Sequence, residues 1–206
     1  MKAILAQKKG MTQLFDSTGN VRPCTVLDIS NVKVIGFRDE KKDGYQAYIL
    51  GKDSKKVKSV NKAEKGKYES IDFFPTYISE IRDDQTELKA GDTVLPTLIC
   101  KEGDLISVSG MTKGKGFAGV VKLHHMHGGP KTHGQSNKHR SIGSIASGQT
   151  FAHVAKGRRM ARKMGNDNVT IKNLKVLKID EVNGLMCVAG AVPGMKGTYI
   201  IVKKVK

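Results

Sequence analysis

Histidines are concentrated in one short stretch of the chain. The segment LHHMHGGPKTHGQSNKHR, residues 123–140, holds five of the six histidines in the whole sequence. A histidine ring can bind a transition metal, transfer protons, or contact nucleic acid by stacking and hydrogen bonding. The surrounding residue types decide between these three kinds of site.

A metal site requires partners that this stretch lacks. His125, His127 and His133 are separated by two and six residues, which is loosely compatible with zinc coordination. Catalytic zinc often has a carboxylate or cysteine ligand, and metal-bound histidine usually donates its second ring nitrogen to a carboxylate or carbonyl. No acid or cysteine lies nearby, and the local cations oppose a divalent ion. We therefore expect no metal and no cofactor.

Catalytic motifs are also incomplete. The serine-rich segment SIGSIASG, residues 141–148, lacks the G-x-S-x-G pattern, and no acid follows until Asp167. GKGFAG, residues 114–119, matches G-x-G-x-x-G but has no acid about twenty residues later for a ribose. We expect that the chain is not an enzyme. The alternative left open is a histidine-dependent, metal-assisted enzyme that acts on nucleic acid.

The charge is segregated along the chain. Lysine and arginine number 36 against 19 acids, a net charge of +17. Residues 105–166 contain no acid, but they carry 11 lysines and arginines, all six histidines and 11 glycines. Such a segment has too little apolar surface to fold compactly alone, and its like charges repel. We expect it to become ordered on a polyanion, with nonspecific DNA compaction as a further alternative to RNA binding.

Two motifs supply seven of the sixteen expected nucleic-acid contacts. In TKGKGFAG, residues 112–119, glycines let the backbone approach a phosphate chain that the lysines neutralise. In KGRRMARKMGN, residues 156–166, arginines can make forked phosphate contacts or stack on bases. The candidate RNA-binding residues are Lys113, Lys115, Lys122, His124, His125, His127, Lys131, His133, Lys138, His139, Arg140, Lys156, Arg158, Arg159, Arg162 and Lys163.

The rest of the sequence predicts a β-rich body that positions this segment. Alternating apolar residues predict a barrel or sandwich with strands over 3–15, 23–29, 32–37, 45–50, 92–100, 104–110, 168–180, 185–192 and 198–205. Residues 52–70 are expected to form a solvated loop, and 75–84 a short helix. We expect three parts: body strands in 1–110, a basic extension over 111–164, and the C-terminal body strands in 165–206.

Membrane insertion and disulfide chemistry are not expected. The first residues contain only a four-residue apolar run, and no later stretch approaches the length of a membrane span. Cys24, Cys100 and Cys187 are odd in number and far apart in the sequence, so we expect reduced, buried thiols.

Five collinear motifs carry a resemblance to a known family. They are KKGMTQLF (8–15), SVSGMTKGKGFAGVVK (107–122), GGPKTHG (128–134), KGRRMARKMGNDNVTIKNLKV (156–176) and GLMCVAGAVPGMKG (184–197). Through them the chain resembles the bacterial type of the universal ribosomal protein L3 family over essentially its full length.

The resemblance implies a translation-protein-type β-barrel body with a long, basic, largely irregular inserted loop and little helix. It implies a cytoplasmic protein of the large ribosomal subunit that binds 23S ribosomal RNA, nucleates subunit assembly and supports the RNA near the peptidyl transferase centre. The RNA, and not the protein, performs peptide transfer. Implied partners are that RNA and neighbouring proteins of the L14 and L19 types, with no membrane and no small-molecule substrate.

The chain departs from the family pattern at two places. Many bacterial relatives have arginine, tryptophan or other aromatics where this chain reads LHHMH, residues 123–127. Many also read QTPG where this chain reads QTFA, residues 149–152, so that Phe151 offers an additional stacking surface. Gln149 matches a glutamine that some relatives methylate on its side-chain amide, and methylation of Gln149 is a hypothesis. A peptide mass from native ribosomes without an added methyl group would contradict it.

Overall fold

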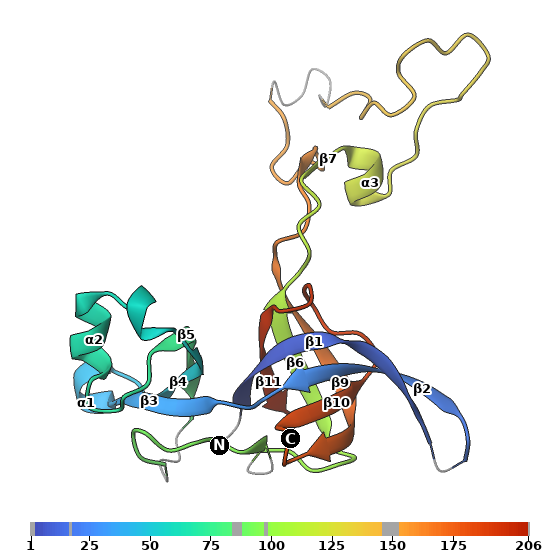
Figure 1. The fold of residues 1–206 in the computed structure, drawn as a ribbon. Helices are drawn as coiled ribbons and strands as arrows, with labels where there is room; N and C mark the ends of the chain where they lie inside the picture. Colours follow the sequence, from blue (N-terminus) through green and yellow to red (C-terminus); the bar gives the residue numbers. More distant parts are fainter. Residues whose placement is uncertain (1–2, 17, 84–87, 97–98, 146–152, 206) are drawn as a thin grey trace. The chain divides into compact units, whose positions relative to one another are not determined.

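The computed structural model describes residues 3–16, 18–83, 88–96, 99–145 and 153–205 (Figure 1). Internal contacts divide the chain into two compact units. The first, residues 1–111 with 168–206, is called the body below, and the second, Thr112–Asp167, is called the arm. In the described part of the chain, no helix is long and apolar enough to span a membrane.

A closed six-stranded barrel forms the larger part of the body. Its strands are hydrogen-bonded in the order β1-β11-β6-β9-β10-β2, and β2 returns to β1. Every pairing is antiparallel. The bounds are β1 Ala3–Phe15, β2 Val21–Asp28, β6 Leu105–Met111, β9 Asn168–Asp180, β10 Leu185–Ala189 and β11 Tyr199–Lys204. The prediction of a mostly β fold with little helix is confirmed.

A second, three-stranded sheet has the order β3-β4-β5. Its strands are β3 Val32–Arg38, β4 Ala47–Ser54 and β5 Pro75–Arg82, and the connections contain α1 Glu40–Asp43, η1 Val57–Ser59 and α2 Lys62–Tyr68. The prediction of a loop over residues 52–70 is therefore wrong at Lys62–Tyr68, where α2 forms. Tyr68, the last residue of α2, is the buried residue of this helix, and the rest of the helix consists of polar and small residues.

Two further element predictions are wrong. Residues 75–84 were expected to be helical, but β5 pairs along its length with β4. Its inward positions Tyr77, Ser79 and Ile81 alternate with outward ones, and the exposed Ile78 disguises that period of two. The predicted strand over 92–100 is absent among its described residues, where only an isolated bridge joins Thr93 to Lys33.

The apolar core extends through both sheets of the body. Ala3, Ile4, Leu5 and Ala6 at the start of β1 are all buried, so this strand is covered on both of its faces. They belong to one cluster with side chains of the second sheet such as Leu50. Burial of consecutive residues, instead of alternate ones, is what a strand between two packed layers requires.

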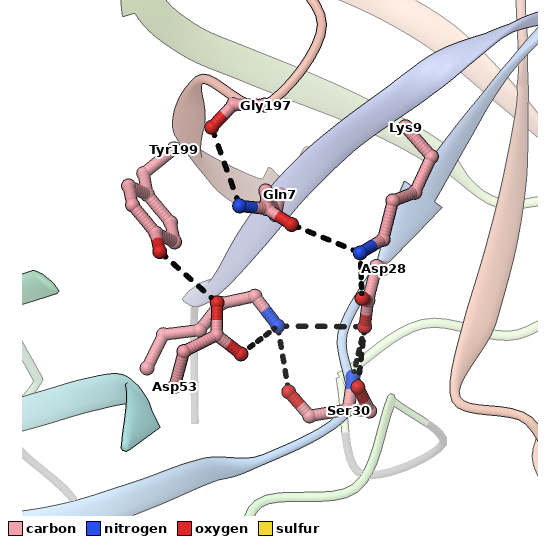
Figure 2. A network of polar contacts seen from close by, with 8 residues as sticks. Gln7, Lys9, Asp28, Ser30, Asp53, Gly197 and Tyr199 are labelled. Atoms are coloured by element: carbon pink, nitrogen blue, oxygen red, sulfur yellow. Dashed lines mark hydrogen bonds and ion pairs between the residues drawn. The ribbon is translucent and has the colours of Figure 1, made fainter. Parts of the chain in front are cut away.

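A buried lysine links the two sheets of the body (Figure 2). Lys52, in β4, has no exposed side-chain surface, and its Nζ donates to the Ser30 carbonyl oxygen over 2.6 Å. The same ammonium lies 3.4 Å from Asp28 Oδ1 and 3.6 Å from Asp53 Oδ1. Lys9, in β1, approaches the other oxygen of Asp28 at 2.9 Å. The ion pairs and the hydrogen bond thus replace the contacts with water that these charged groups lose on burial.

The same network controls the acidity of Asp28. Burial alone would raise the pKa of this carboxyl group. Hydrogen bonds from Lys9 and Ser30, together with the charge of Lys52, outweigh burial and lower the pKa of Asp28 from 3.8 to about 2. The ionised form of Asp28 is therefore part of the folded body.

The three thiols are free, as the sequence predicted. Cys24 and Cys100 are buried, whereas Cys187 is half-buried. Burial raises the pKa of the Cys100 thiol to about 11 and also raises the pKa of Cys187. Thiolates, the reactive form of cysteine, are therefore disfavoured at both positions.

Candidate nucleic-acid interface

A short antiparallel stem forms the base of the arm. Its strands β7 (Phe117–Ala118) and β8 (Arg162–Lys163) pair Phe117 with Lys163 and Ala118 with Arg162. Below this pair the Lys115 N–H donates to the Met164 carbonyl, and the Met164 N–H donates to the Gly116 carbonyl. At the end of the stem, Thr112 and Asp167 exchange two hydrogen bonds. The two basic motifs predicted to contact RNA are therefore brought side by side.

Gly165 makes the close approach of these two chain segments possible. Its φ is +70°, in the left-handed region that side chains disfavour. A β-carbon at this position would lie 2.1 Å from the carbonyl oxygen of Lys113. Only glycine fits both the backbone conformation and the available space.

A short helix follows the stem. α3 (Val120–His124) begins after Gly119 and ends at His125, whose φ of 55° terminates it. The His124 ring donates an Nε2–H to the carbonyl oxygen of Met160, over 3.1 Å. In the described residues of the arm, only Ala118 and Val120 are buried. The helix thus has a very small apolar contact, and hydrogen bonding supplements it.

The histidine-rich segment folds back on itself beyond α3. The Gly129 N–H donates to the His139 carbonyl, and His139 Nδ1–H donates to the Pro130 carbonyl over 2.9 Å. A hollow of about 520 Å³ lies here, lined by Val121, Gly128, Gly129, Lys131, His139 and Arg140. Since the His139 proton on Nδ1 is used, Nε2 of the neutral ring is available as an acceptor.

Close backbone packing holds this return. A β-carbon on Gly128 would lie 2.4 Å from the His139 carbonyl oxygen, so the chain needs glycine there. Further along the arm, Arg158 donates from its guanidinium to the Ser144 carbonyl oxygen over 2.6 Å. These contacts give the arm a defined local path with few buried side chains.

The sixteen candidate residues lie almost entirely at the surface. Only His124 and His139 are half-buried, and the other fourteen are exposed. In the described part of the chain, none of the sixteen forms an ion pair with an acid. The stem brings Lys113 and Lys115 close to Arg162 and Lys163, and Lys131, His139 and Arg140 share the hollow. His125, His127 and His133 are exposed along the loop.

The arrangement does not resemble a metal centre or an active site. Among the described residues, no three histidine, cysteine or acidic side chains gather closely enough to hold a metal ion. The two ring hydrogen bonds described above go to backbone carbonyls, which orient an imidazole without activating a nucleophile. Exposed, uncompensated cations are instead what phosphate groups attract.

One exposed residue of the arm was missed from the sequence. The Phe117 side chain is 79% exposed, in the middle of the glycine- and lysine-rich motif. The available signal was an aromatic residue within a glycine- and lysine-rich motif, which suits contact with a nucleic acid. Gln149 and Phe151, by contrast, lie outside the described residues.

Comparisons with known proteins agree with this picture. The family model described as ribosomal protein L3 matches residues 78–189. The large ribosomal subunit protein uL3 of Dehalococcoides mccartyi is 43% identical over 204 residues, covering 99% of this chain and 98% of the relative. The uL3 of Chloroherpeton thalassium is also 43% identical, with 97% of each chain covered. That of Herpetosiphon aurantiacus is 42% identical, covering 99% of this chain and 96% of the relative.

Proposed function

The chain belongs to the ribosomal protein L3 family, and on this premise we propose that it binds 23S ribosomal RNA in the large ribosomal subunit through its arm. The relatives are structural ribosomal proteins and not enzymes, which confirms the expectation that this chain is not an enzyme. One observation carries the proposal. Fourteen candidate residues are exposed on an arm that has a single acid, Asp167, in its entire sequence.

The physical basis of the binding is electrostatic. Each lysine or arginine that meets a phosphate releases a condensed counterion, which gives affinity that falls as salt rises. Forked contacts from arginine and hydrogen bonds from imidazole to phosphates or 2′-hydroxyls would then define the position of the arm on the folded RNA. This mode suits the observed arm, because it requires exposed side chains and little apolar burial.

The family resemblance supports a more detailed role. The arm supports RNA near the peptidyl transferase centre, while the RNA itself performs the reaction. Binding nucleates subunit assembly, because a basic arm that neutralises phosphates lets RNA segments approach each other. The protein contacts neighbouring proteins of the L14 and L19 types. The protein works in the cytoplasm as part of the ribosome, with no membrane or small-molecule partner.

Salt dependence provides the test. Replacing Arg158, Arg159 and Arg162 together by alanine should weaken binding of full-length protein to 23S ribosomal RNA. Because each lost phosphate contact reduces the slope of log K against log salt by about 0.7–0.9, the slope should become shallower by about 2 to 3. Filter binding at several salt concentrations measures both quantities.

A triple variant in the body serves as a matched control. Lys41, Lys42 and Lys58 are exposed, and their replacement by alanine removes the same charge. This variant should keep most of the wild-type slope. Equal slopes for the arm variant and the wild type would refute the proposed role, and equal affinity for generic duplex DNA would favour nonspecific compaction.

A further inference from the structure

Phe117 is unusual because its large aromatic ring is exposed although the neighbouring apolar residues Ala118 and Val120 are buried. Among the described large apolar side chains, only Val182 is more exposed than Phe117. Phe117 lies in β7, directly opposite Lys163 of β8. Opposite residues of an antiparallel pair project from the same face, with β-carbons about 5 Å apart. The aromatic ring and the Lys163 ammonium therefore occupy one face of the stem.

The backbone holds the ring in this orientation. Successive residues of a strand point to opposite faces, and the next residue, Ala118, is 4% exposed. Gly116, just before Phe117, has a φ of +68° and accepts the hydrogen bond from Met164. Burial on one side and a constrained turn on the other thus direct Phe117 outward. Its exposure follows from the stem and not from a freely moving loop.

The surroundings of the ring indicate the chemistry of its partner. Lys115 lies two residues before Phe117, and Lys163 lies directly opposite it on β8; both are exposed. An apolar protein surface covering the ring would have to remove water from these cations without compensating charge. An unpaired nucleotide supplies both an aromatic face and an adjoining phosphate.

We propose that Phe117 is a stacking platform for one unpaired nucleobase of the bound ribosomal RNA, with Lys115 and Lys163 neutralising the adjoining phosphates. This inference rests on the proposed RNA-binding function and assigns to it a base contact besides the phosphate contacts. A base stacked on an aromatic side chain gains affinity through ring contact, which does not depend on counterion release. Stacking and charge can therefore be separated experimentally.

The absence of tryptophan from the whole chain makes a direct optical test possible. A Phe117→Trp variant of the full-length protein carries a single indole at the platform. Adding 23S ribosomal RNA should quench its fluorescence strongly, because a nucleobase stacks on the ring. Val182→Trp is the matched control, since Val182 is 95% exposed and belongs to the body. Its emission should change little.

Affinity measurements supply the second readout. Phe117→Leu should bind 23S ribosomal RNA about 5- to 150-fold more weakly, the range found for loss of one stacked base. Its salt slope should equal that of the wild type, and Phe117→Tyr should restore affinity. Lys163→Ala should instead make the slope shallower by about one. Circular dichroism verifies that each variant is folded.

The outcomes distinguish this inference from the proposal beneath it. Unquenched emission from Phe117→Trp in a protein that binds RNA normally would overturn the stacking role, as would wild-type affinity of Phe117→Leu. A change in the salt slope of Phe117→Leu would show that the residue acts only by positioning the cations. If the wild-type protein itself does not bind ribosomal RNA, the proposed function fails.

Discussion

At the scale of single residues, the body and the arm use charge in opposite ways. In the body, Lys52 is buried and compensated by Asp28, Asp53 and the Ser30 carbonyl (Figure 2). Removing one member of such a group would leave the others without compensation, so a substitution there should destabilise the body. In the arm, the candidate lysines and arginines are exposed and form no ion pair with an acid among the described residues. Lysine thus has a structural role at Lys52 because it is buried and paired, whereas the exposed lysines of the arm are the proposed RNA contacts.

Asp28 should make the body sensitive to acid. Its pKa is about 2 in the folded state against 3.8 ordinarily, so it stabilises the fold above pH 3.8. That contribution, about 2 kcal/mol, is lost as the pH falls from 3.8 to 2, because the unfolded chain binds the proton more readily. Urea unfolding at several pH values measures the loss. Asp28→Asn should lack this part of the pH dependence, and identical profiles would contradict the assignment.

At the scale of elements, strands with regular alternation were predictable from sequence. The predicted bounds of β1 and β9 agree with the structure at both ends, since each apolar run ends at turn residues, although β1 begins with four consecutive buried residues. β5 was misread because the exposed Ile78 lies on its outward face. α2 was missed because a polar helix with one buried tyrosine has almost no apolar periodicity.

The sequence predicted which segment forms the candidate interface, but it did not predict the course of the backbone in that segment. An acid-free basic segment can be identified by reading charges along the chain. The pairing of β7 with β8 depends on two dipeptides more than forty residues apart, and the close approaches at Gly128 and Gly165 depend on backbone positions. No local pattern encodes such contacts. The predicted contacts of individual residues with RNA stay predictions.

The stem should depend on Gly165. Gly165→Ala places a methyl group against the Lys113 carbonyl in a left-handed backbone, so it should destabilise the stem by more than about 2 kcal/mol. Hydrogen exchange of the Lys115 and Met164 amides should then accelerate at least about thirtyfold, while amides of the barrel exchange as before.

Gly116→Ala provides the control for that substitution. Gly116 has a similar positive φ, but a β-carbon there meets no atom within 4 Å. This variant should cost only about 1 kcal/mol, the backbone penalty alone. Equal exchange rates in the two variants would show that the contact with Lys113 is unimportant.

At the scale of the whole molecule, structure and binding are assigned to different parts of the chain. The body contains the apolar cluster, the buried lysine and the described ion pairs. The arm has two buried residues among those described and all sixteen candidate RNA-binding residues. We therefore predict that the body folds without the arm.

Deletion of the arm tests this prediction. Met111 and Asn168 are register partners in β6 and β9, so a short glycine-serine linker can join them when residues 112–167 are removed. The shortened protein should show a β-rich circular dichroism spectrum and cooperative urea unfolding, but it should lose most affinity for ribosomal RNA. Noncooperative unfolding would mean that the arm is required for the body.

The pairing of Met111 with Asn168 also bears on how the polypeptide reaches its native state. β6 and β9 form an antiparallel hairpin, and the arm, Thr112–Asp167, is the long connection between these two strands. The entropy lost in closing such a connection grows only logarithmically, by about 0.6 kcal/mol for each doubling of its length. Insertions or deletions in the connection therefore change the barrel's folding free energy only slightly, so the arm can vary in length while the barrel keeps its stability.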